Sequence, residues 1–384
     1  MRRELTTTAV VPATTARMRP VRLSGTLSLY LARQVLLGIG IMVFALGALA
    51  YIIDVVELLR RAGDHEQATL GTVLLMAGLH LPLLMQKLMP FAVLFGTILS
   101  FQRLNRSQEL IAARAIGVSV WQFLTPALAV AFGLGTVIVV AFNPLASATF
   151  ARYEQLEARY LSSRSSVVSV SAGGLWLRQV DAEGELLIHA RQMQRDPPLI
   201  EDVVLFRFDE QHQFASRVDA PSAELVDGQW RLARPLLSRP DGTRELRESL
   251  LVPSAFTPEG IQQSFAPPAT MSFWDLPHFI DSLEAVGFSA REHRLYLHGL
   301  LALPLLLSAM LLIGTTFSLR VVRRGGTGVL MVGALVTGFV FYVLSDVVFA
   351  VGLSGRLPVV LAAWTPAGVT ILLGFTTLFH LEDG

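Results

Sequence analysis

The stretch VLLGIGIMVFALGALAYII, which occupies residues 35–53, decides the fold class of this chain. A helix needs about 20 mostly apolar residues to cross the hydrocarbon core of a bilayer, so this run predicts a transmembrane helix. Five similar runs follow it, at residues 82–101, 118–142, 300–319, 329–351 and 358–379. Residues 69–81 are also apolar, but they contain His80 and end at Pro82, which predicts a separate helix in the membrane interface.

The composition agrees with a membrane protein. Of the 384 residues, 52% are hydrophobic and only 16% are charged, which is unusual for a soluble domain. The formal net charge of +1 gives no sign of a nucleic-acid partner. The absence of cysteine excludes disulfides, thiolate metal sites and cysteine nucleophiles.

The arginines predict the orientation of the helices. They gather in three segments, of which the first is the N-terminal tail. The other two are the loop after span two, with Arg103, Arg106 and Arg114, and the loop after span four, with Arg320, Arg323 and Arg324. With six spans these three segments share one side, and basic loops mark the cytoplasmic side. We therefore expect both termini in the cytoplasm. Residues 1–26 are expected to be a disordered tail that either touches anionic lipids or is simply solvated.

The segment between spans three and four follows a different pattern. Alternating apolar and polar residues predict short strands at 175–178, 185–189, 203–209, 229–234 and 244–252. Such strands, without helices between them, predict a sandwich, jelly roll or open barrel. Flanking helices are expected over 146–161, continuing span three, and from Ser272 to Gly287. The histidines and carboxylates here have no metal-ligand spacing, so we predict neither a metal site nor a catalytic site.

ATP chemistry must come from elsewhere if ATP drives this protein. A Walker motif needs a lysine followed by serine or threonine, and the only lysine, Lys87, precedes Leu88 inside a span. The loop at 102–117 therefore becomes a candidate docking site for an ATPase. It predicts an amphipathic helix over about 103–117, with Ser107 as N-cap and Glu109 in the first turn. A capped connector whose charges only face water is the alternative.

Charged residues at the outer end of span one allow two interpretations. Asp54 and Glu57 lie one turn before Arg60 and Arg61, a spacing that permits pairs within the helix. The same arginines could instead bind the phosphates of a lipid headgroup. Lys87 is unfavourable in hydrocarbon unless it faces a cavity or a partner, or snorkels to the interface.

The order of these features resembles the LptF/LptG permeases of lipopolysaccharide export, over about residues 28–380. The motifs that carry the resemblance are 54–61 (DVVELLRR), 106–110 (RSQEL), 174–178 (GLWLR), 338–342 (GFVFY), Leu357-Pro358, and Trp364 with Pro366. Within the family, residues 174–176 and the loop at 323–326 look more like LptG. The resemblance implies six transmembrane helices, three on each side of an inserted all-β, jellyroll-like periplasmic domain, in a bacterial inner membrane.

The implied organisation has four parts. Residues 1–26 form the cytoplasmic tail, and 27–147 form spans one to three with the coupling helix. Residues 148–290 form the periplasmic domain with its flanking helices, and 291–384 form spans four to six.

The resemblance also implies partners: an LptF-like permease half, a dimer of LptB-type ATPases that binds ATP and Mg²⁺, an LptC-like single-span protein and an LptA-like periplasmic bridge. This chain would bind no cofactor itself. Glu109 matches the coupling-helix glutamate, flanked by Arg106 and Arg114. The expected lipopolysaccharide contacts are Arg60, Arg61, Asp54, Glu57, Lys87 and Arg152. Some relatives carry a lysine near Asp54, and an acid there can meet a phosphate only through a cation or a paired arginine.

The expected function is therefore extraction of lipopolysaccharide from the inner membrane and its transfer to a periplasmic bridge. The alternative is a membrane-anchored scaffold or sensor whose β domain binds a periplasmic protein. A secondary transporter is disfavoured, because a soluble domain divides two dissimilar triplets of helices.

Overall fold

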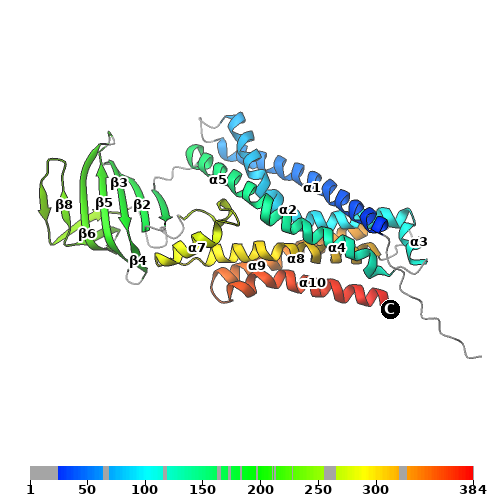
Figure 1. Ribbon diagram of the computed structural model, residues 1–384. Coiled ribbons are helices and arrows are strands. Elements are labelled where there is room, and N and C mark those ends of the chain that lie inside the picture. Colours follow the sequence, from blue (N-terminus) through cyan, green and yellow to red (C-terminus); the bar gives the residue numbers. More distant parts are fainter. Residues whose placement is uncertain are drawn as a thin grey trace, which may run out of the picture.

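The computed structural model describes residues 25–63, 69–115, 119–161, 166–171, 174–181, 184–195, 198–209, 211, 213–226, 228–254, 265–319 and 327–383. It consists of a bundle of long helices and a β domain that extends from one end of the bundle (Figure 1). The short helix α3 (Glu109–Ala115) and the C-terminus lie at the opposite end. The predicted tail up to residue 24 and the arginines of the 320–326 loop lie outside the described residues.

Six helices among the described residues are long and apolar enough to cross a membrane. They are α1 (Gly25–Ala62), α2 (Leu70–Arg106), a helix made of α4 (Val120–Val137), the π-helical turn η1 (Ile138–Phe142) and α5 (Asn143–Tyr160), then α8 (Arg291–Leu319), α9 (Thr327–Leu353) and α10 (Val359–Asp383). Each predicted span falls on one of them, so the six-span prediction is confirmed. The outward continuation of span three is also confirmed, because α5 follows η1 without a break.

The separate interfacial helix predicted for residues 69–81 is wrong. Thr69 caps α2 by accepting a hydrogen bond from the backbone N–H of Thr72, and α2 then runs through Pro82 and Pro90 to Arg106. A proline removes only its own N–H donor, and helices packed in a membrane bundle tolerate such interruptions. His80, which looked like an interfacial residue, lies inside α2 and has a partner on α1.

The coupling helix begins later than the sequence predicted. Residues 103–106 form the last turn of α2, and Ser107 is its C-cap, donating its backbone N–H to Arg103 O, instead of the N-cap of a new helix. Gln108, with a φ of 58°, turns the chain, and α3 starts at Glu109. The polar residues that follow span two therefore lengthen α2 by one more turn before the chain reverses.

Helices α1 and α2 pack with their backbones almost in contact. A Cβ atom on Gly96 would lie 2.6 Å from Cα of Ile39, and one on Gly38 would lie 2.5 Å from the carbonyl oxygen of Gly96. Small residues permit such close approach between membrane helices. This crossing fixes the path of α1, which is otherwise widely exposed along its length.

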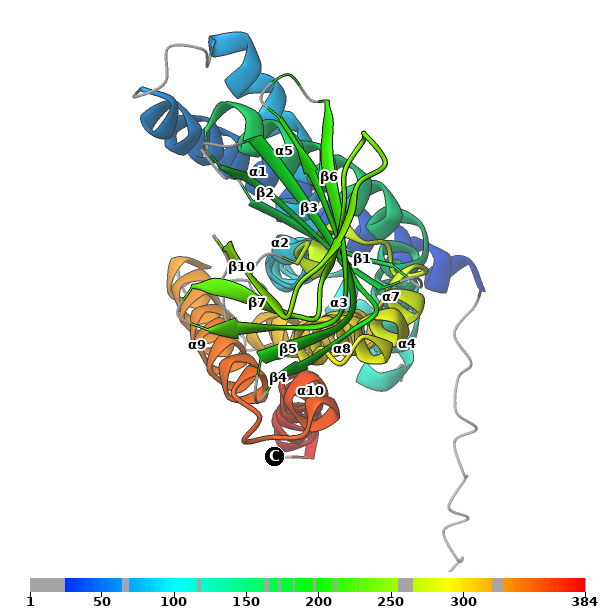
Figure 2. The same ribbon diagram turned by 90° about the vertical axis from the view of Figure 1, so that its left-hand side faces the viewer.

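The β domain is one antiparallel sheet, which confirms the inserted all-β domain. Its strands are β1 (Ser166–Ser171), β2 (Gly174–Asp181), β3 (Gly184–Ala190), β4 (Gln192–Arg195), β5 (Pro198–Phe208), β6 (Phe214–Val226), β7 (Gln229–Ala233), β8 (Leu236–Ser238), β9 (Arg244–Leu246) and β10 (Ser249–Pro253). The main order is β1-β2-β3-β5-β6-β7-β10, with β4 on β5 and the β8–β9 hairpin on β6. Viewed end-on, the sheet is strongly bent (Figure 2).

The sequence missed β1, β4, β6 and β8. The longest of them, β6, spans 13 residues and contains Pro221. Its register with β5 is kept on both sides of the proline, where Glu201 pairs with Ser222 and Val203 with Ala220. Asp202, which lies between them on β5 and opposite Pro221, has a φ of 50°, so the ladder is interrupted at the position where the proline has no N–H to donate. The single strand predicted over 244–252 is divided into β9 and β10, which pair with β8 and β7.

Helix α7 (Leu276–Ala285), preceded by the 3₁₀ turn η2 (Pro268–Thr270), closes the β domain on the side of the bundle. Ile280, Leu283 and Phe288 belong to the same buried cluster as the strands. The backbone N–H of Met193 on β4 donates to the carbonyl of Val286 at 3.0 Å. Gly287, with a φ of 90°, ends the helix as predicted. The sheet is therefore anchored to the helix that leads into α8.

Candidate functional site

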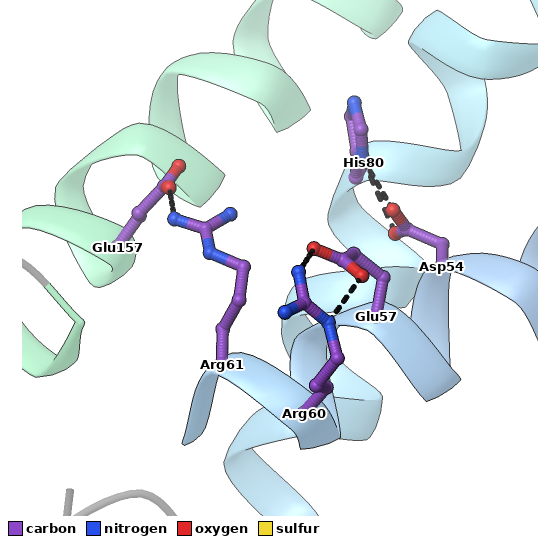
Figure 3. Close-up of polar contacts among 6 residues, drawn as sticks. All are labelled: Asp54, Glu57, Arg60, Arg61, His80 and Glu157. Carbon is purple, nitrogen blue, oxygen red and sulfur yellow. Dashed lines mark hydrogen bonds and ion pairs between the residues drawn. The ribbon is translucent and has the colours of Figure 1, made fainter. Parts of the chain in front are cut away.

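The end of α1 that lies away from α3 carries three polar contacts between side chains (Figure 3). The first joins Asp54 to α2. Nδ1 of His80 lies 3.0 Å from Oδ1 and 3.1 Å from Oδ2 of Asp54, and both side chains are largely buried, with exposures of 18% and 14%. The imidazole also stacks on the ring of Tyr153 from α5, with 4.7 Å between ring centroids. One histidine thus connects α1, α2 and α5.

The two arginines predicted to bind headgroups differ in their surroundings. Arg60 forms a pair within its own helix, with NH2 2.6 Å from Oε1 of Glu57, and its side chain is 73% exposed. Arg61 instead reaches across to Glu157 on α5 and is 39% exposed. The predicted pair within the helix is therefore present for Arg60. Arg61 makes a tertiary contact that holds α5 against the end of α1.

These contacts determine how the side chains at this end of α1 can bind a ligand. Arg60 lies on the surface and can turn toward a ligand, because only one partner on the same helix restrains it. For Arg61 to meet a phosphate, that phosphate must replace or share the carboxylate of Glu157. Asp54 contacts neither arginine in the structure, since His80 takes both of its oxygens.

The remaining predicted lipid contacts lie apart from this cluster. Lys87 is exposed on α2, seven residues after His80, next to the buried Gln86. Arg152 is exposed on α5, where its NH1 donates to Oε1 of Gln155 at 2.9 Å. Four of the six predicted lipid contacts therefore lie together at one end of α1: Asp54, Glu57, Arg60 and Arg61. Lys87 and Arg152 take no part in the pairs that these four residues form.

A second site lies at the other end of α1. Glu109, the first residue of α3, is exposed, and its Oε2 accepts a hydrogen bond of 2.9 Å from the hydroxyl of Tyr30 on α1. Leu110 is buried in the helix core beside Leu31 and anchors α3 to the bundle. Arg106 ends α2 two residues before Gln108, and Arg114 belongs to α3, although its side chain lies outside the described part of the structure.

The β domain contains a cavity of about 310 Å³. Its lining is mostly apolar and comes from five strands: Leu186, Leu205, Arg207, Val218, Leu237, Leu250, Leu251, Val252 and Pro253. Four of these residues, Leu186, Leu205, Val218 and Val252, also belong to the buried core that the strands share with α7. The bent sheet thus provides a space whose walls suit an apolar ligand.

Three residues of these sites were not predicted from the sequence. The single histidine in the apolar run at 69–81 was a visible signal, but it was taken to mark an interface. Glu157 and Tyr30 gave no local signal, because their partners lie 96 and 79 residues away in the chain. Only the packing of α5 and α3 against α1 reveals them.

Comparison with known proteins agrees with this architecture. The family model described as lipopolysaccharide export system permease LptF/LptG matches residues 29–380. The chain is similar to the LptG permease protein of Haemophilus influenzae, with 22% identity over 372 residues that cover 93% of this chain and 99% of that protein. It is also similar to LptG of Escherichia coli K12, with 24% identity over 364 residues, 93% of this chain and 98% of that protein. The chain therefore belongs to the LptF/LptG family of lipopolysaccharide export permeases.

Proposed function

We propose that this chain is one permease half of an ABC transporter that extracts lipopolysaccharide from the inner membrane and passes it to a periplasmic bridge. Family membership makes it a multi-pass permease subunit, and it favours this function over a scaffold or sensor. Support for the direction of transport comes from the long axis of the molecule, because the β domain and α3 lie at opposite ends of the bundle (Figure 1). In this proposal the β domain lies in the periplasm and both termini lie in the cytoplasm, which the arginine distribution supports.

The observation that carries this proposal is the surface of α1. Large apolar side chains stay exposed along one helix, among them Leu37, Ile41, Phe44 and Ile52. The same helix ends in the charged segment that contains Arg60 and Arg61. Acyl chains match the apolar part, and the phosphorylated sugars of lipid A match the arginines. Lipopolysaccharide has both parts joined in one molecule, so α1 forms one wall of the binding site.

The pairs at the end of α1 suggest how the headgroup binds. Arg60 makes the first contact, since it is exposed and restrained only by Glu57. Arg61 joins when the phosphate displaces Glu157, which loosens α5 from α1. Asp54 does not meet the phosphate directly, because both oxygens of its carboxylate face the imidazole of His80. Lys87 and Arg152 contribute charge outside this cluster.

The ATPase that supplies energy for transport binds at the cytoplasmic end of the bundle. An LptB-type ATPase dimer, which holds ATP and Mg²⁺, docks on α3 of this chain and on the same helix of an LptF-like half. The exposed carboxylate of Glu109 at the start of α3 is the contact point, together with Arg106 at the end of α2 and Arg114 in the same short helix. An LptC-like single-span protein and an LptA-like bridge complete the assembly. ATP-driven closure narrows the membrane cavity, and the acyl chains then enter the cavity of the β domain.

A pull-down from native membranes tests this proposal. Tagged wild-type protein is compared with Glu109→Arg and with the control Glu292→Arg, which reverses an exposed carboxylate at the start of α8, near the β domain. We expect wild type and the control to retain a cytosolic ATPase and a second six-span subunit, and Glu109→Arg to lose the ATPase. Equal recovery with Glu109→Arg would contradict docking at α3. Absence of any ATPase from the wild type would contradict the transporter proposal as a whole.

A further inference from the structure

The contact between Tyr30 and Glu109 joins α1 and α3, two helices with different proposed functions. Tyr30 lies in the second turn of α1, the helix whose last turn carries Arg61 and which lines the proposed lipid site. Glu109 begins α3, the proposed docking helix. Their hydrogen bond of 2.9 Å is made between side chains 79 residues apart, and neither side chain is buried. The sequence around either residue does not require this contact.

Helix α3 needs such contacts because it is short. Its seven residues are too few to form a stable helix alone, so its position depends on tertiary interactions. Leu110 provides the apolar anchor, and Tyr30, Leu31 and Phe123 share a small cavity with it. The Tyr30 hydroxyl provides a polar contact to the first residue of the helix.

The geometry leaves part of the carboxylate available. Tyr30 donates to Oε2 of Glu109, and among the described residues no protein group donates to Oε1. A carboxylate can accept several hydrogen bonds, so a cationic side chain of a docked ATPase can bind Oε1 while Tyr30 keeps Oε2. The tyrosine restricts the rotamers of Glu109 and so reduces the entropy that docking must remove.

We propose that Tyr30 is a positioning residue for the ATPase: it orients the carboxylate of Glu109 for docking and links any movement of α3 directly to α1. The inference rests on the proposed function, because it requires an ATPase at α3. Helix α1 has 38 residues, which corresponds to a length of about 57 Å, and it is helical throughout. A displacement of α3 is therefore transmitted through Tyr30 to the end of α1 that pairs with Glu157.

The test uses the full complex of both permease halves with the ATPase, and compares Tyr30→Phe with wild type. This change removes one hydroxyl and keeps the ring. The matched control is Tyr51→Phe, which removes another hydroxyl from α1, one that donates to the carbonyl of Leu74. Two quantities are measured: the affinity of the ATPase for the permease, and the amount of lipopolysaccharide extracted per ATP hydrolysed.

We expect Tyr30→Phe to weaken ATPase binding roughly threefold to tenfold, as for the loss of one ordinary intramolecular hydrogen bond at an exposed site, and to lower the extraction per ATP. Tyr51→Phe should behave as wild type. In a Glu109→Ala background, Tyr30→Phe should have no further effect, because its partner is already absent.

Three outcomes would overturn this inference, and they differ in whether they also contradict docking of the ATPase at α3. If Tyr30→Phe equals wild type while Glu109→Ala weakens ATPase binding, docking at α3 stands and only the role of Tyr30 falls. If Tyr30→Phe weakens binding equally in the Glu109→Ala background, Tyr30 acts through packing. If Glu109→Ala itself binds the ATPase normally, the proposed docking site falls as well.

Discussion

The carboxylate of Asp54 on α1 and the imidazole of His80 on α2 face each other at 3.0 Å, and both lie mostly out of contact with solvent. Helices α1 and α2 also meet at their glycine crossing, more than three turns closer to α3. The pair therefore fixes a second point of contact between the two helices, close to the arginines that we propose to bind lipid.

Replacing His80 by alanine should destabilise the protein. The carboxylate of Asp54, with 14% of its side chain exposed, would lose its partner, and an unsatisfied polar group in such a position costs about 1–3 kcal/mol. Thermal unfolding of the purified protein in detergent measures the change. In the double variant Asp54→Ala/His80→Ala, the loss should be smaller than the sum of the two single losses. Additive losses would show that the two residues do not interact.

Removing the carboxylate of Glu157 should strengthen lipopolysaccharide binding. Glu157→Gln frees Arg61 from its competitor, so a phosphate gains the full charge of the guanidinium. Since exposed pairs contribute about 0.2–1 kcal/mol, we expect an increase in affinity of up to about fivefold. Binding of lipid A to the purified protein provides the measurement. Glu284→Gln, which breaks an ion pair with Arg294 near the β domain, is the control and should leave binding unchanged. Weaker binding by Glu157→Gln would contradict the assignment of Arg61.

The glycine crossing should tolerate no side chain. Gly96→Ala places a methyl group 2.6 Å from the backbone of Ile39, so α1 and α2 must separate. We expect a loss of at least about 1–3 kcal/mol, as in other overpacked interfaces, seen as a lower unfolding temperature. Gly40→Ala is the matched control, because its methyl group meets nothing within 4 Å. A normal unfolding temperature for Gly96→Ala would show that the helices pack less closely than described.

The sequence predicted the parts of this protein that repeat a simple pattern. Apolar runs long enough to span a bilayer gave six spans, and Gly287 marked a helix end correctly, because both depend on local chemistry. The prediction failed where a long-range contact overrides a local signal. His80 and Pro82 together indicated a break, yet Asp54 from another helix satisfies the histidine and α2 continues.

The same reasoning explains the predictions for the site. The pair between Glu57 and Arg60 follows from helical spacing alone. The partner of Arg61 could not be predicted, because it depends on how α5 packs against α1. In the β domain, β6 was not predicted, and its pairing with β5 continues on both sides of Pro221.

The hairpin of β8 and β9 should respond to acid. The backbone N–H of Thr243 donates to Oδ1 of Asp241 at 2.9 Å, and this bond lowers the pKa of Asp241 below its ordinary value of 3.8. The ionised form is therefore favoured in the folded hairpin. Its contribution is complete above the ordinary value and is lost as the pH falls through the lowered pKa.

Amide exchange at Thr243, corrected for the intrinsic rate, measures this effect. Protection in the wild type should decrease as the pH falls below about 4, the region of the ordinary carboxyl pKa. Asp241→Asn cannot titrate, so its protection should show no such step. A step of equal size in both proteins would assign the effect to another group.

Filling the cavity of the β domain should block a late step of transport without affecting earlier ones. Val218 on β6 lines the cavity of about 310 Å³, and phenylalanine at this position would occupy part of it. Because free space is present, the loss of stability should remain below the roughly 1–3 kcal/mol typical of overpacking. The ATPase should still bind, since α3 lies at the opposite end of the molecule (Figure 1).

Photocrosslinking of lipopolysaccharide at two places separates these steps. With Val218→Phe, we expect crosslinks to α1 to persist or accumulate, and crosslinks to the periplasmic bridge to fall, because the acyl chains no longer fit between the strands. Leu246→Phe, on the exposed strand β9, enlarges a side chain outside the cavity and should transfer lipid normally. Normal transfer by Val218→Phe would mean that the lipid does not pass through this cavity, and that another β domain of the complex carries it.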